Sequence, residues 1–307
     1  MADNGIGFDT SNYTTSIAFL EKNGHYKNIR KILEVDSGEK GLRQQNAVFA
    51  HIKNLPELLS DKYLSKAACV GVSVRPRSIQ NSYMPCFLVG KAAATIAARS
   101  LGVPCYEFSH QQGHIAAGIY SCGNTYLYEH PFYAFHISGG TMEILSVDGF
   151  NKMQICARAL DITAGQLIDR TGIMLGLKFP CGKELEKLAK QWTEPIQKFH
   201  ICLKGPNCCL SGFENKVLDF IKRGFTPAYI ARFVFEVLFT YICNMIEQVY
   251  VTYNQKPVLF IGGVMSNLLL RKRLSNLYDS YFASPELSSD NAVGIAWLSI
   301  LKNEHLF

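Results

Sequence analysis

Two histidines, His110 and His114, are the residues whose types and spacing most directly suggest chemistry. Residues four apart on a helix share one face, so both imidazoles can reach a single metal ion. Gln111 stands where the zinc-protease pattern His-Glu-x-x-His has the glutamate that acts as general base. The pair therefore favours a metal site without peptidase chemistry, although two ordinary surface or interface histidines would have the same spacing.

A third metal ligand is offered by Asp290, which together with Asn291 begins the last expected helix. Aspartate is a common helix N-cap, and that is the plainer interpretation. Two imidazoles and one carboxylate, with coordination positions left open, suit Fe(II) or Zn(II). The sequence therefore suggests one divalent metal ion and does not separate iron from zinc.

Two glycine-rich turns suggest anion binding. Residues 138–141 (Ser-Gly-Gly-Thr) lie between two expected strands, and residues 262–267 (Gly-Gly-Val-Met-Ser-Asn) join a strand to a helix. Glycines let the backbone approach an anion, successive N–H groups form a concave donor nest, and a helix N-terminus favours phosphate. The alternatives are an ordinary hairpin turn for the first segment and close packing of a strand against a helix for the second.

Acidic residues follow the second expected hairpin. Asp161 and Asp169 come first, spaced around Gly165, and Glu186 comes after Gly182. The Asp169 carboxylate is suited to accept hydrogen bonds from ribose hydroxyls. The plainer interpretation is that these are solvated carboxylates on an α/β surface.

The elements that must position these residues repeat along the chain. A strand, a turn and a second strand are expected at 5–9 and 15–20, with a third strand at 27–33. The same arrangement returns at 132–137, 143–147 and 153–157. This repeat predicts an α/β fold of two duplicated halves with a ligand cleft between them. The expected halves are residues 1–125, joined by a C-terminal helix at 289–307, and residues 126–288.

The remaining elements set the context of the candidate residues. In the first half, Gly38 and Gly41 interrupt the chain, and a helix is expected to end near Pro56. A strand at 103–106 precedes a short helix at 110–120, so the histidine pair follows a strand at the sheet edge where ligands of α/β proteins gather. In the second half, residues 193–212 are expected to form a loop, and Thr226-Pro227 opens a long helix.

The composition fits a folded intracellular protein. The chain has 307 residues, is 48% hydrophobic and 18% charged, and its net charge of +6 is not gathered into a Lys/Arg block. Such a chain can bury the cores of two domains, and its charge permits contact with nucleic acid without arguing for it. Ten scattered cysteines are typical of reduced thiols. No signal peptide is recognised, and Glu236 and Glu247 interrupt the longest apolar helix, so we expect a soluble, cytoplasmic protein that does not span the membrane.

Seven stretches of the chain, taken together, resemble the TsaD family, the tRNA threonylcarbamoyladenosine transferases formerly called O-sialoglycoprotein endopeptidases. In chain order they read FDTSNYTTS, FSHQQGHIAAG, ISGGT, DITAGQLIDRTGIMLGL, FPCGKELEKLA, FIGGVMSNLLLRKRL and FASPELSSDNAVGIAW. They follow the family's order and spacing across nearly the whole chain. Any one of these motifs is weak evidence, whereas the ordered set is specific.

The resemblance implies a fold, a ligand and an activity. The fold is that of the actin-like ATPases (ASKHA), and the metal ligands are His110, His114 and Asp290. The ligand is an adenine nucleotide or threonylcarbamoyl-adenylate, and the family moves the threonylcarbamoyl group from this adenylate to the exocyclic amine of a tRNA adenosine beside the anticodon. The implied substrate contacts are Ile137, Ser138, Gly139, Gly140, Thr141, Asp169, Gly182, Glu186 and Asn267.

The same resemblance implies tRNA as a partner, together with TsaB-like and TsaE-like proteins, and leaves a homodimer or heterodimer open.

The chain departs from the family on the side expected to meet the acceptor. Where Cys-Asp-Glu-Thr is usual in the opening turn, residues 12–15 are Asn-Tyr-Thr-Thr, so two acidic groups are lost. Where Gly-Pro-Gly-Leu is usual, residues 75–78 are Arg-Pro-Arg-Ser. The residues assigned to this acceptor side are Asp9, Ser11, Tyr13, Arg75 and Arg77.

Three functions remain open from the sequence. The first is metal-dependent transfer of a threonylcarbamoyl group to tRNA, in which the tRNA amine attacks directly and no acyl-enzyme forms. The second is an enzyme that uses a carbamoyl-adenylate or ATP on another acceptor, with Arg75 and Arg77 recognising an anion. The third is a scaffold subunit that binds nucleotide without turnover.

Overall fold

The structure is a computed structural model that describes residues 3–11, 13–34, 42–59, 61–79, 81–124 and 126–306. The turn residue Asn12 and the expected chain breaks at Gly38 and Gly41 lie outside the described residues. The chain divides into two compact units. Unit 1 consists of Met1–Asn124 and Ser289–Phe307, and unit 2 consists of Thr125–Ser288.

Unit 1 is built on a five-stranded sheet with the order β3-β2-β1-β4-β5. Strands β1 (Gly5–Ser11), β2 (Thr14–Leu20) and β3 (Tyr26–Ile32) form an antiparallel meander. Strands β4 (Cys69–Arg75) and β5 (Cys105–Ser109) extend the sheet in parallel. Every residue of β1 and β2 is buried, because helices cover both faces of this part of the sheet.

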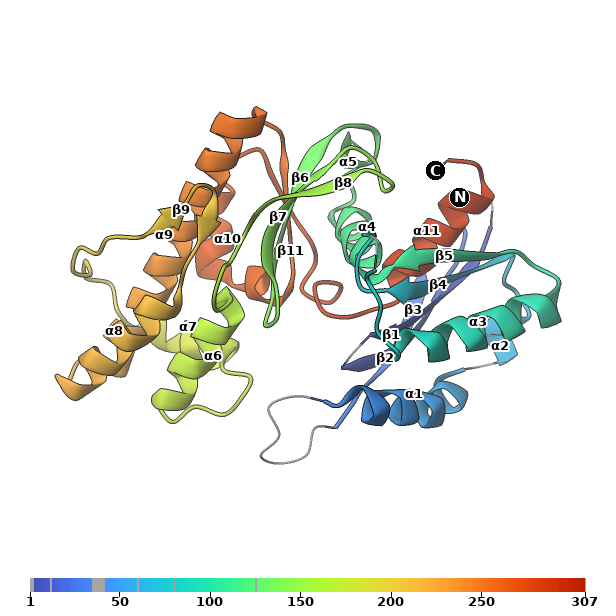
Figure 1. Cartoon of the computed structure of the whole chain (residues 1–307), viewed down its shortest axis with the longest axis horizontal. Coiled ribbons are helices and arrows are strands. Elements are labelled where there is room, and N and C mark those ends of the chain that lie inside the picture. Colours follow the sequence, from blue (N-terminus) through green and yellow to red (C-terminus); the bar gives the residue numbers. More distant parts are fainter. Residues whose placement is uncertain are drawn as a thin grey trace. The chain divides into compact units, whose positions relative to one another are not determined.

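Helices α1 (Gln44–Leu58) and α3 (Phe87–Leu101) cover one face of this sheet, and α4 (His110–Cys122) and α11 (Val293–Asn303) cover the other (Figure 1). A short helix, α2, spans Asp61–Leu64. Glycines allow a close approach on the second face. A Cβ added at Gly7 would lie 2.3 Å from the carbonyl oxygen of Ala292, and one at Gly294 would lie 1.9 Å from that of Gly113. Helix α11 therefore lies directly on the sheet and against α4.

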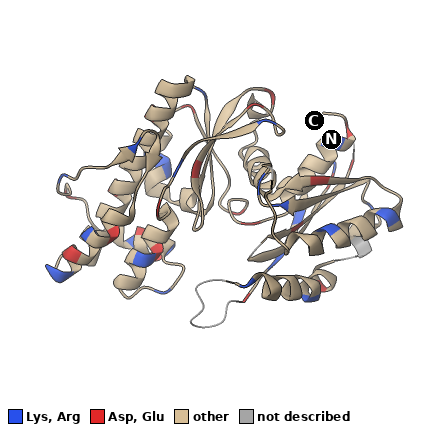
Figure 2. Ribbon diagram, viewed as in Figure 1, with Lys and Arg blue, Asp and Glu red and all other residues tan. Residues whose placement is uncertain are grey.

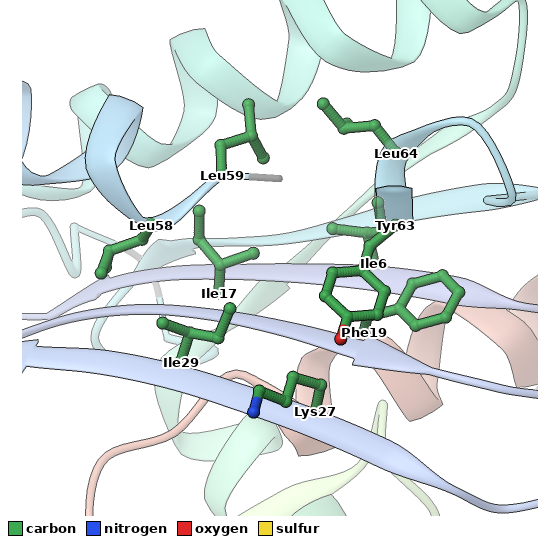
Figure 3. A pocket seen from close by; sticks show the side chains of 9 residues that line it. All are labelled: Ile6, Ile17, Phe19, Lys27, Ile29, Leu58, Leu59, Tyr63 and Leu64. Atoms are coloured by element: carbon green, nitrogen blue, oxygen red, sulfur yellow. The ribbon is translucent and has the colours of Figure 1, made fainter. Parts of the chain in front are cut away.

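The core of unit 1 contains a small apolar gap on the α1 side of the sheet. It has a volume of about 10 Å³, and Figure 3 shows its lining side chains, which include Ile6, Phe19 and Tyr63. A space of this size holds about one water-sized sphere and offers few polar groups. We therefore take it as a packing defect of the core and not as a ligand site.

Unit 2 repeats the topology of unit 1. Its sheet has the order β12-β11-β6-β7-β8. Strands β6 (Phe132–Ile137), β7 (Met142–Val147) and β8 (Met153–Arg158) form the antiparallel meander, and β11 (Val258–Ile261) and β12 (Ser280–Phe282) are added in parallel. Read from the third meander strand outward, the strand orders of the two units correspond one to one, which confirms the predicted duplication of the fold.

The helices of unit 2 surround α9 (Pro227–Tyr253), the longest helix among the described residues. They are α6 (Ala164–Met174), α7 (Gly182–Lys190), α8 (Ser211–Lys222) and α10 (Leu268–Leu274). Unit 2 also contains the one-turn helix α5 (Tyr126–Glu129) and a short 3-10 helix at Gly263–Ser266. Within the described part of the chain, α9 alone is long and apolar enough to cross a membrane, but 67% of its apolar window is buried inside the protein. It serves as the core helix of unit 2. Acidic and basic side chains are interspersed along α7 and α8 (Figure 2).

Three local expectations differ from the structure. Strand β5 covers residues 105–109, two or three residues later than expected, so it ends directly before His110. The expected loop at 193–212 contains a small hairpin, β9 (Leu203–Lys204) with β10 (Asn207–Cys208), and its end begins α8. Helix α1 continues past Pro56 for two residues, since a proline in the last turn costs only one backbone hydrogen bond before the helix ends.

Candidate functional site

Helix α4 begins immediately after β5, and this junction places both histidines. Ser109, the last residue of β5, is the N-cap of α4, where its side chain accepts a hydrogen bond from the backbone N–H of Gln112 at 3.1 Å. The Gln112 side chain in turn accepts from the N–H of Ser109 at 2.7 Å, which completes a capping box. His110 and His114 therefore occupy the first and second turns of a helix whose start is fixed.

Three donor atoms meet at this helix start. His110 Nε2 and His114 Nε2 are 3.0 Å apart, and Asp290 Oδ1 lies 3.2 Å from His114 Nε2 and 3.5 Å from His110 Nε2. The circle through the three atoms has a radius of about 1.9 Å, and Zn–N and Zn–O bonds are about 2.0–2.2 Å long. The donor set thus fits one ion of this class. It is the one group of three or more such ligands found among the described residues.

Asp9 lies behind His110. Its Oδ2 is 2.9 Å from His110 Nδ1, and its other oxygen accepts a hydrogen bond from the Ser73 hydroxyl. In a neutral imidazole whose Nδ1 proton is held by this carboxylate, Nε2 has a lone pair for a metal ion, and a carboxylate behind a metal-ligating histidine is the usual arrangement. Asp9 is fully buried with both oxygens engaged. Asp9, which the resemblance assigns to the acceptor side, thus contacts one of the three candidate metal ligands from behind.

The charges at this site favour a cation. Burial lowers the pKa of His110, but the carboxylates of Asp9 and Asp290 outweigh burial and raise that pKa to about 10. For Asp290, burial acts to raise the pKa, but hydrogen bonds from both histidines and their charges hold it well below its usual value. Two carboxylates around two imidazoles therefore stabilise positive charge, whether it comes from a proton or from a metal ion.

The remaining residues assigned to the acceptor side lie at the ends of β1 and β4 or in the turns that follow them. Ser11 is buried at the end of β1, and its hydroxyl has no hydrogen-bond partner among the described residues. Tyr13 is 44% exposed in the turn that follows. Arg75 is exposed at the end of β4, where it pairs with Ser109, and the backbone N–H of Arg77 donates to Ser82 Oγ. Unit 1 therefore collects these side chains around one edge of its sheet.

In unit 2, the glycine-rich turn at 138–141 closes the β6–β7 hairpin. The N–H of Ser138 donates to the carbonyl of Thr141, and the N–H of Thr141 donates to Ser138 Oγ. A Cβ added at Gly139 or Gly140 would meet no atom within 4 Å, and both glycines are exposed. The outer side of this turn is therefore open to a ligand.

Helix α6 points its N-terminus at this turn. Thr163 is its N-cap and also donates from its hydroxyl to the carbonyl of Gly139 at 2.7 Å. A Cβ added at Gly165 would lie 2.6 Å from the Cα of Gly139, so no larger residue fits at that position. The positive end of the helix dipole thus lies against the open turn, which is the local arrangement that binds phosphate in many proteins.

Two further contacts fix the positions of other residues that are expected to bind substrate. Gly262, with φ +98, follows β11, and an added Cβ there would lie 2.3 Å from the carbonyl oxygen of Ile137. The turn that carries Asn267 therefore lies beside the 138–141 turn. Asp169, on α6, accepts from the N–H of Cys181 at 2.8 Å, directly before Gly182. Burial raises the pKa of Asp169, and the opposing effect of this hydrogen bond is smaller.

Glu186 and Asn267 meet at the start of α10. The Glu186 carboxylate accepts from the N–H of Leu268 at 3.2 Å and forms an ion pair with Lys190 at 2.6 Å. Asn267 is the N-cap of α10 and accepts from the N–H of Leu270. A hollow of about 380 Å³ adjoins them and is lined by Lys190, Arg232, Phe235, Glu236, Leu268, Leu269, Leu270, Lys272 and Arg273. This volume lies in the range of about 300–1,000 Å³ typical of ligand pockets.

Three residues that the sequence did not assign to the site also help to build it. Thr163 joins α6 to the 138–141 turn, and Ser73 and Gln112 fix Asp9 and α4 in unit 1. The spacing Thr163–Gln166 is a capping-box signal that the sequence offers directly. The contact between Asp9 and Ser73 joins residues 64 positions apart, and no local pattern reveals it.

A protein-family model described as TsaD, tRNA N6-adenosine threonylcarbamoyltransferase, matches residues 83–297. The tRNA N6-adenosine threonylcarbamoyltransferase of Methanopyrus kandleri is 26% identical over 86% of this chain and 78% of its own length. That of Thermus thermophilus is 27% identical over 95% and 90%, and that of Kosmotoga olearia is 29% identical over 85% and 82%.

Solved structures show the same fold at lower identity. T. kodakarensis HypF has a TM-score of 0.60 at 15% identity, with 99% of this chain and 48% of that chain covered. The Acidaminococcus fermentans (R)-2-hydroxyglutaryl-CoA dehydratase component A has a TM-score of 0.54 at 13% identity, with 98% of each chain covered. These likenesses establish the actin-like ATPase fold. The family match covers most of the chain and includes the histidine pair, Asp290 and both glycine-rich turns of unit 2, and the chain therefore belongs to the TsaD family.

Proposed function

We propose that this chain is a metal-dependent threonylcarbamoyltransferase that moves the threonylcarbamoyl group from its adenylate to a tRNA adenosine next to the anticodon. The observation that carries the proposal is the triangle of His110, His114 and Asp290, backed by Asp9. Homologues named for this activity cover most of the chain. Peptidase chemistry has no support here, because Gln111 replaces the catalytic glutamate of zinc proteases.

The metal ion would be Fe(II) or Zn(II), and it would polarise the carbonyl of the threonylcarbamoyl group. The residues of the chain supply the rest. Asp9 keeps the proton of His110 on Nδ1 and so holds Nε2 ready as a ligand. The open turn at 138–141 and the N-terminus of α6 would bind the adenylate phosphate and stabilise AMP as the leaving group.

The adenosine part of the ligand is assigned to unit 2. Asp169 and Gly182 would contact the ribose. Glu186 contacts Lys190 and Leu268, which line the hollow of about 380 Å³, and Asn267 directly precedes Leu268. Ile137 and Thr141 complete the set at the ends of β6 and its turn.

The residues of this chain offer the fewest candidate groups for activating the acceptor amine. A carboxylate beside the attacking amine acts as a general base and typically contributes on the order of a hundredfold or more in rate. Tyr13 offers a phenol where the family has a carboxylate, so this position supplies no carboxylate base. We therefore expect slow tRNA transfer by the purified chain, and faster transfer with TsaB-like and TsaE-like partners in the cytoplasm.

A second acceptor class is favoured by one observation. The Arg75 guanidinium is exposed and has no ion-pair partner among the described residues. It lies at the end of β4, opposite the residue that caps α4. An unpaired guanidinium in this position suits an anionic group on the acceptor, including a carboxylate or phosphate on a small molecule.

The test supplies threonylcarbamoyl-adenylate with tRNA, or with an anionic small molecule, to the metal-loaded chain and follows release of AMP and labelling of each acceptor. Tyr13→Asp restores one carboxylate, while the side chain at position 14 stays as it is, since a glutamate there would face the Asp290 carboxylate. Transfer to tRNA that rises in Tyr13→Asp supports the proposal. Labelling of the small molecule alone would favour the second class. Binding of the adenylate without any formation of AMP, in all variants and with partners present, would indicate a scaffold.

A further inference from the structure

The third metal ligand reaches the site from a distant part of the chain. Asp290 follows His114 by 176 residues and lies in the segment that leads into α11. Two local hydrogen bonds shape this segment: Asn291 Nδ2 donates to the carbonyl of Ser289 at 2.8 Å, and Asn291 Oδ1 accepts from the N–H of Val293 at 2.9 Å. They fix the course of the backbone. They do not contact the carboxylate that must face the histidines.

Two residues of the sheet contact Asp290 directly. Thr14, at the start of β2, donates its hydroxyl to Asp290 Oδ2 at 3.4 Å. This is the carboxylate oxygen that does not face His114, because Oδ1 makes that contact. Arg30, on the neighbouring strand β3, donates from one guanidinium nitrogen to the hydroxyl of Ser289 and to the carbonyl oxygen of Asp290 at 3.4 Å. The Thr14 contact restrains the side chain of Asp290, and the Arg30 contact restrains its backbone.

The two residues differ in their surroundings. Thr14 is buried, so its hydroxyl has little water to bond with and gains from its carboxylate partner. Arg30 is exposed, and its recorded partners among the described residues are an oxygen of Ser289 and one of Asp290, with no carboxylate in ion-pair contact. The common feature of Thr14 and Arg30 is that both contact the segment that carries the third ligand.

We propose that Thr14 and Arg30 are positioning residues of the metal centre, which hold the Asp290 carboxylate in the orientation that a metal ion requires. The inference rests on the metal site of the proposed function and adds residues to it. A ligand whose rotation is already restricted loses less entropy when the ion binds. Removing such an outer contact typically weakens metal affinity by about 10–100-fold.

The test measures the affinity of the purified protein for Zn²⁺ by competition with a chromophoric chelator, without any turnover. Thr14→Val keeps the size of the side chain and removes the hydroxyl, while Thr14→Ser keeps the hydroxyl. We expect Thr14→Val to bind Zn²⁺ at least about tenfold more weakly. We expect Thr14→Ser to stay close to the unaltered protein. The melting temperature measured in excess chelator separates a loss of folding from a loss of metal affinity.

The second pair is Arg30→Ala and Arg30→Lys, with Lys27→Ala as the matched control on the same strand. Arg30→Ala should weaken Zn²⁺ binding, Arg30→Lys should recover part of it, and Lys27→Ala should bind as the unaltered protein does. Absorption of bound Co²⁺ should shift in Thr14→Val, since the ligand geometry relaxes.

Full Zn²⁺ affinity in both Thr14→Val and Arg30→Ala would overturn the inference. If instead the unaltered protein binds no Zn²⁺ or Fe²⁺, the metal site of the proposed function fails, and this inference fails with it. A third result separates the two cases. If His114→Ala loses Zn²⁺ binding while both Thr14→Val and Arg30→Ala retain it, the metal site stands and only the positioning role of Thr14 and Arg30 is refuted.

Discussion

The contact between Gly113 and Gly294 gives the sharpest structural prediction, because it joins packing to the metal site. An alanine at position 294 would place its Cβ 1.9 Å from the carbonyl oxygen of Gly113 and 2.6 Å from the backbone nitrogen of Ala117. Non-bonded atoms prefer separations of about 3.5–4.0 Å, so α4 and α11 would have to move apart by roughly 1.5 Å. Both clashing atoms belong to the backbone, which cannot turn away as a side chain can.

This displacement has two measurable consequences. Overpacking of this kind typically costs about 1–3 kcal/mol of folding free energy. It would also move α4, which carries His114, away from Asp290. His114 Nε2 and Asp290 Oδ1 are 3.2 Å apart in the structure. After the displacement, one ion could no longer lie about 2 Å from both atoms. We therefore expect Gly294→Ala to unfold at lower denaturant concentration and to bind Zn²⁺ more weakly.

The matched control is Gly212→Ala in α8, where an added Cβ meets no atom within 4 Å. Alanine in a helix is favoured over glycine by about 0.5–1 kcal/mol, so this variant should keep or gain stability. Denaturant unfolding followed by circular dichroism, together with chelator competition for Zn²⁺, checks both variants. A Gly294→Ala protein with unchanged stability and unchanged affinity would refute the view that this glycine contact sets the distance between the two ligands.

Two further predictions concern unit 2. Asp161 accepts hydrogen bonds from the N–H groups of Ile162, Leu210 and Ser211 and from the Ser211 hydroxyl; burial acts to raise its pKa, but these bonds lower it. Its contribution to stability is therefore present above the unfolded pKa of about 3.9 and is lost as pH falls through the lower folded value. Because Asp161 is exposed and solvent screens its contacts, Asp161→Asn should cost no more than about 1 kcal/mol at pH 7, and this cost should shrink as pH falls below about 3.9 in urea unfolding. ATP or AMP should raise the melting temperature, and Asp169→Ala and Asn267→Ala should weaken that shift; no shift with any adenine nucleotide in the presence of metal would contradict the nucleotide assignment.

The duplicated topology and the main elements were predictable because they depend on local patterns. Alternating apolar strands bounded by glycines recur at β1–β2 and at β6–β7, and Thr226-Pro227 marks the start of α9. The short strand β12 and helix α8 were not expected. Strand β12 has three residues and is defined by pairing with β11, and the register of such an edge strand is set by its neighbour rather than by its own sequence.

The candidate site shows the same division between local and long-range information. The spacing of His110 and His114 predicted a shared helical face, and the structure brings their Nε2 atoms within 3.0 Å. The roles of Asp9 and Thr14 could not be read from spacing, because each depends on a partner about 100 or more positions away. The sequence resemblance placed both in the opening turn region, but only the structure shows that Asp9 supports a ligand from behind.

The central claim is that one metal ion is held by His110, His114 and Asp290, and metal content tests it most directly. The protein is purified without oxygen, loaded with Fe²⁺ or Zn²⁺, desalted and measured by elemental analysis, together with His114→Ala and the control His25→Ala, an exposed histidine elsewhere in unit 1. Near-ultraviolet circular dichroism confirms that each variant is folded. The account predicts about one ion per chain in the unaltered protein and the control, and little in His114→Ala. Full metal occupancy in a folded His114→Ala protein would contradict it.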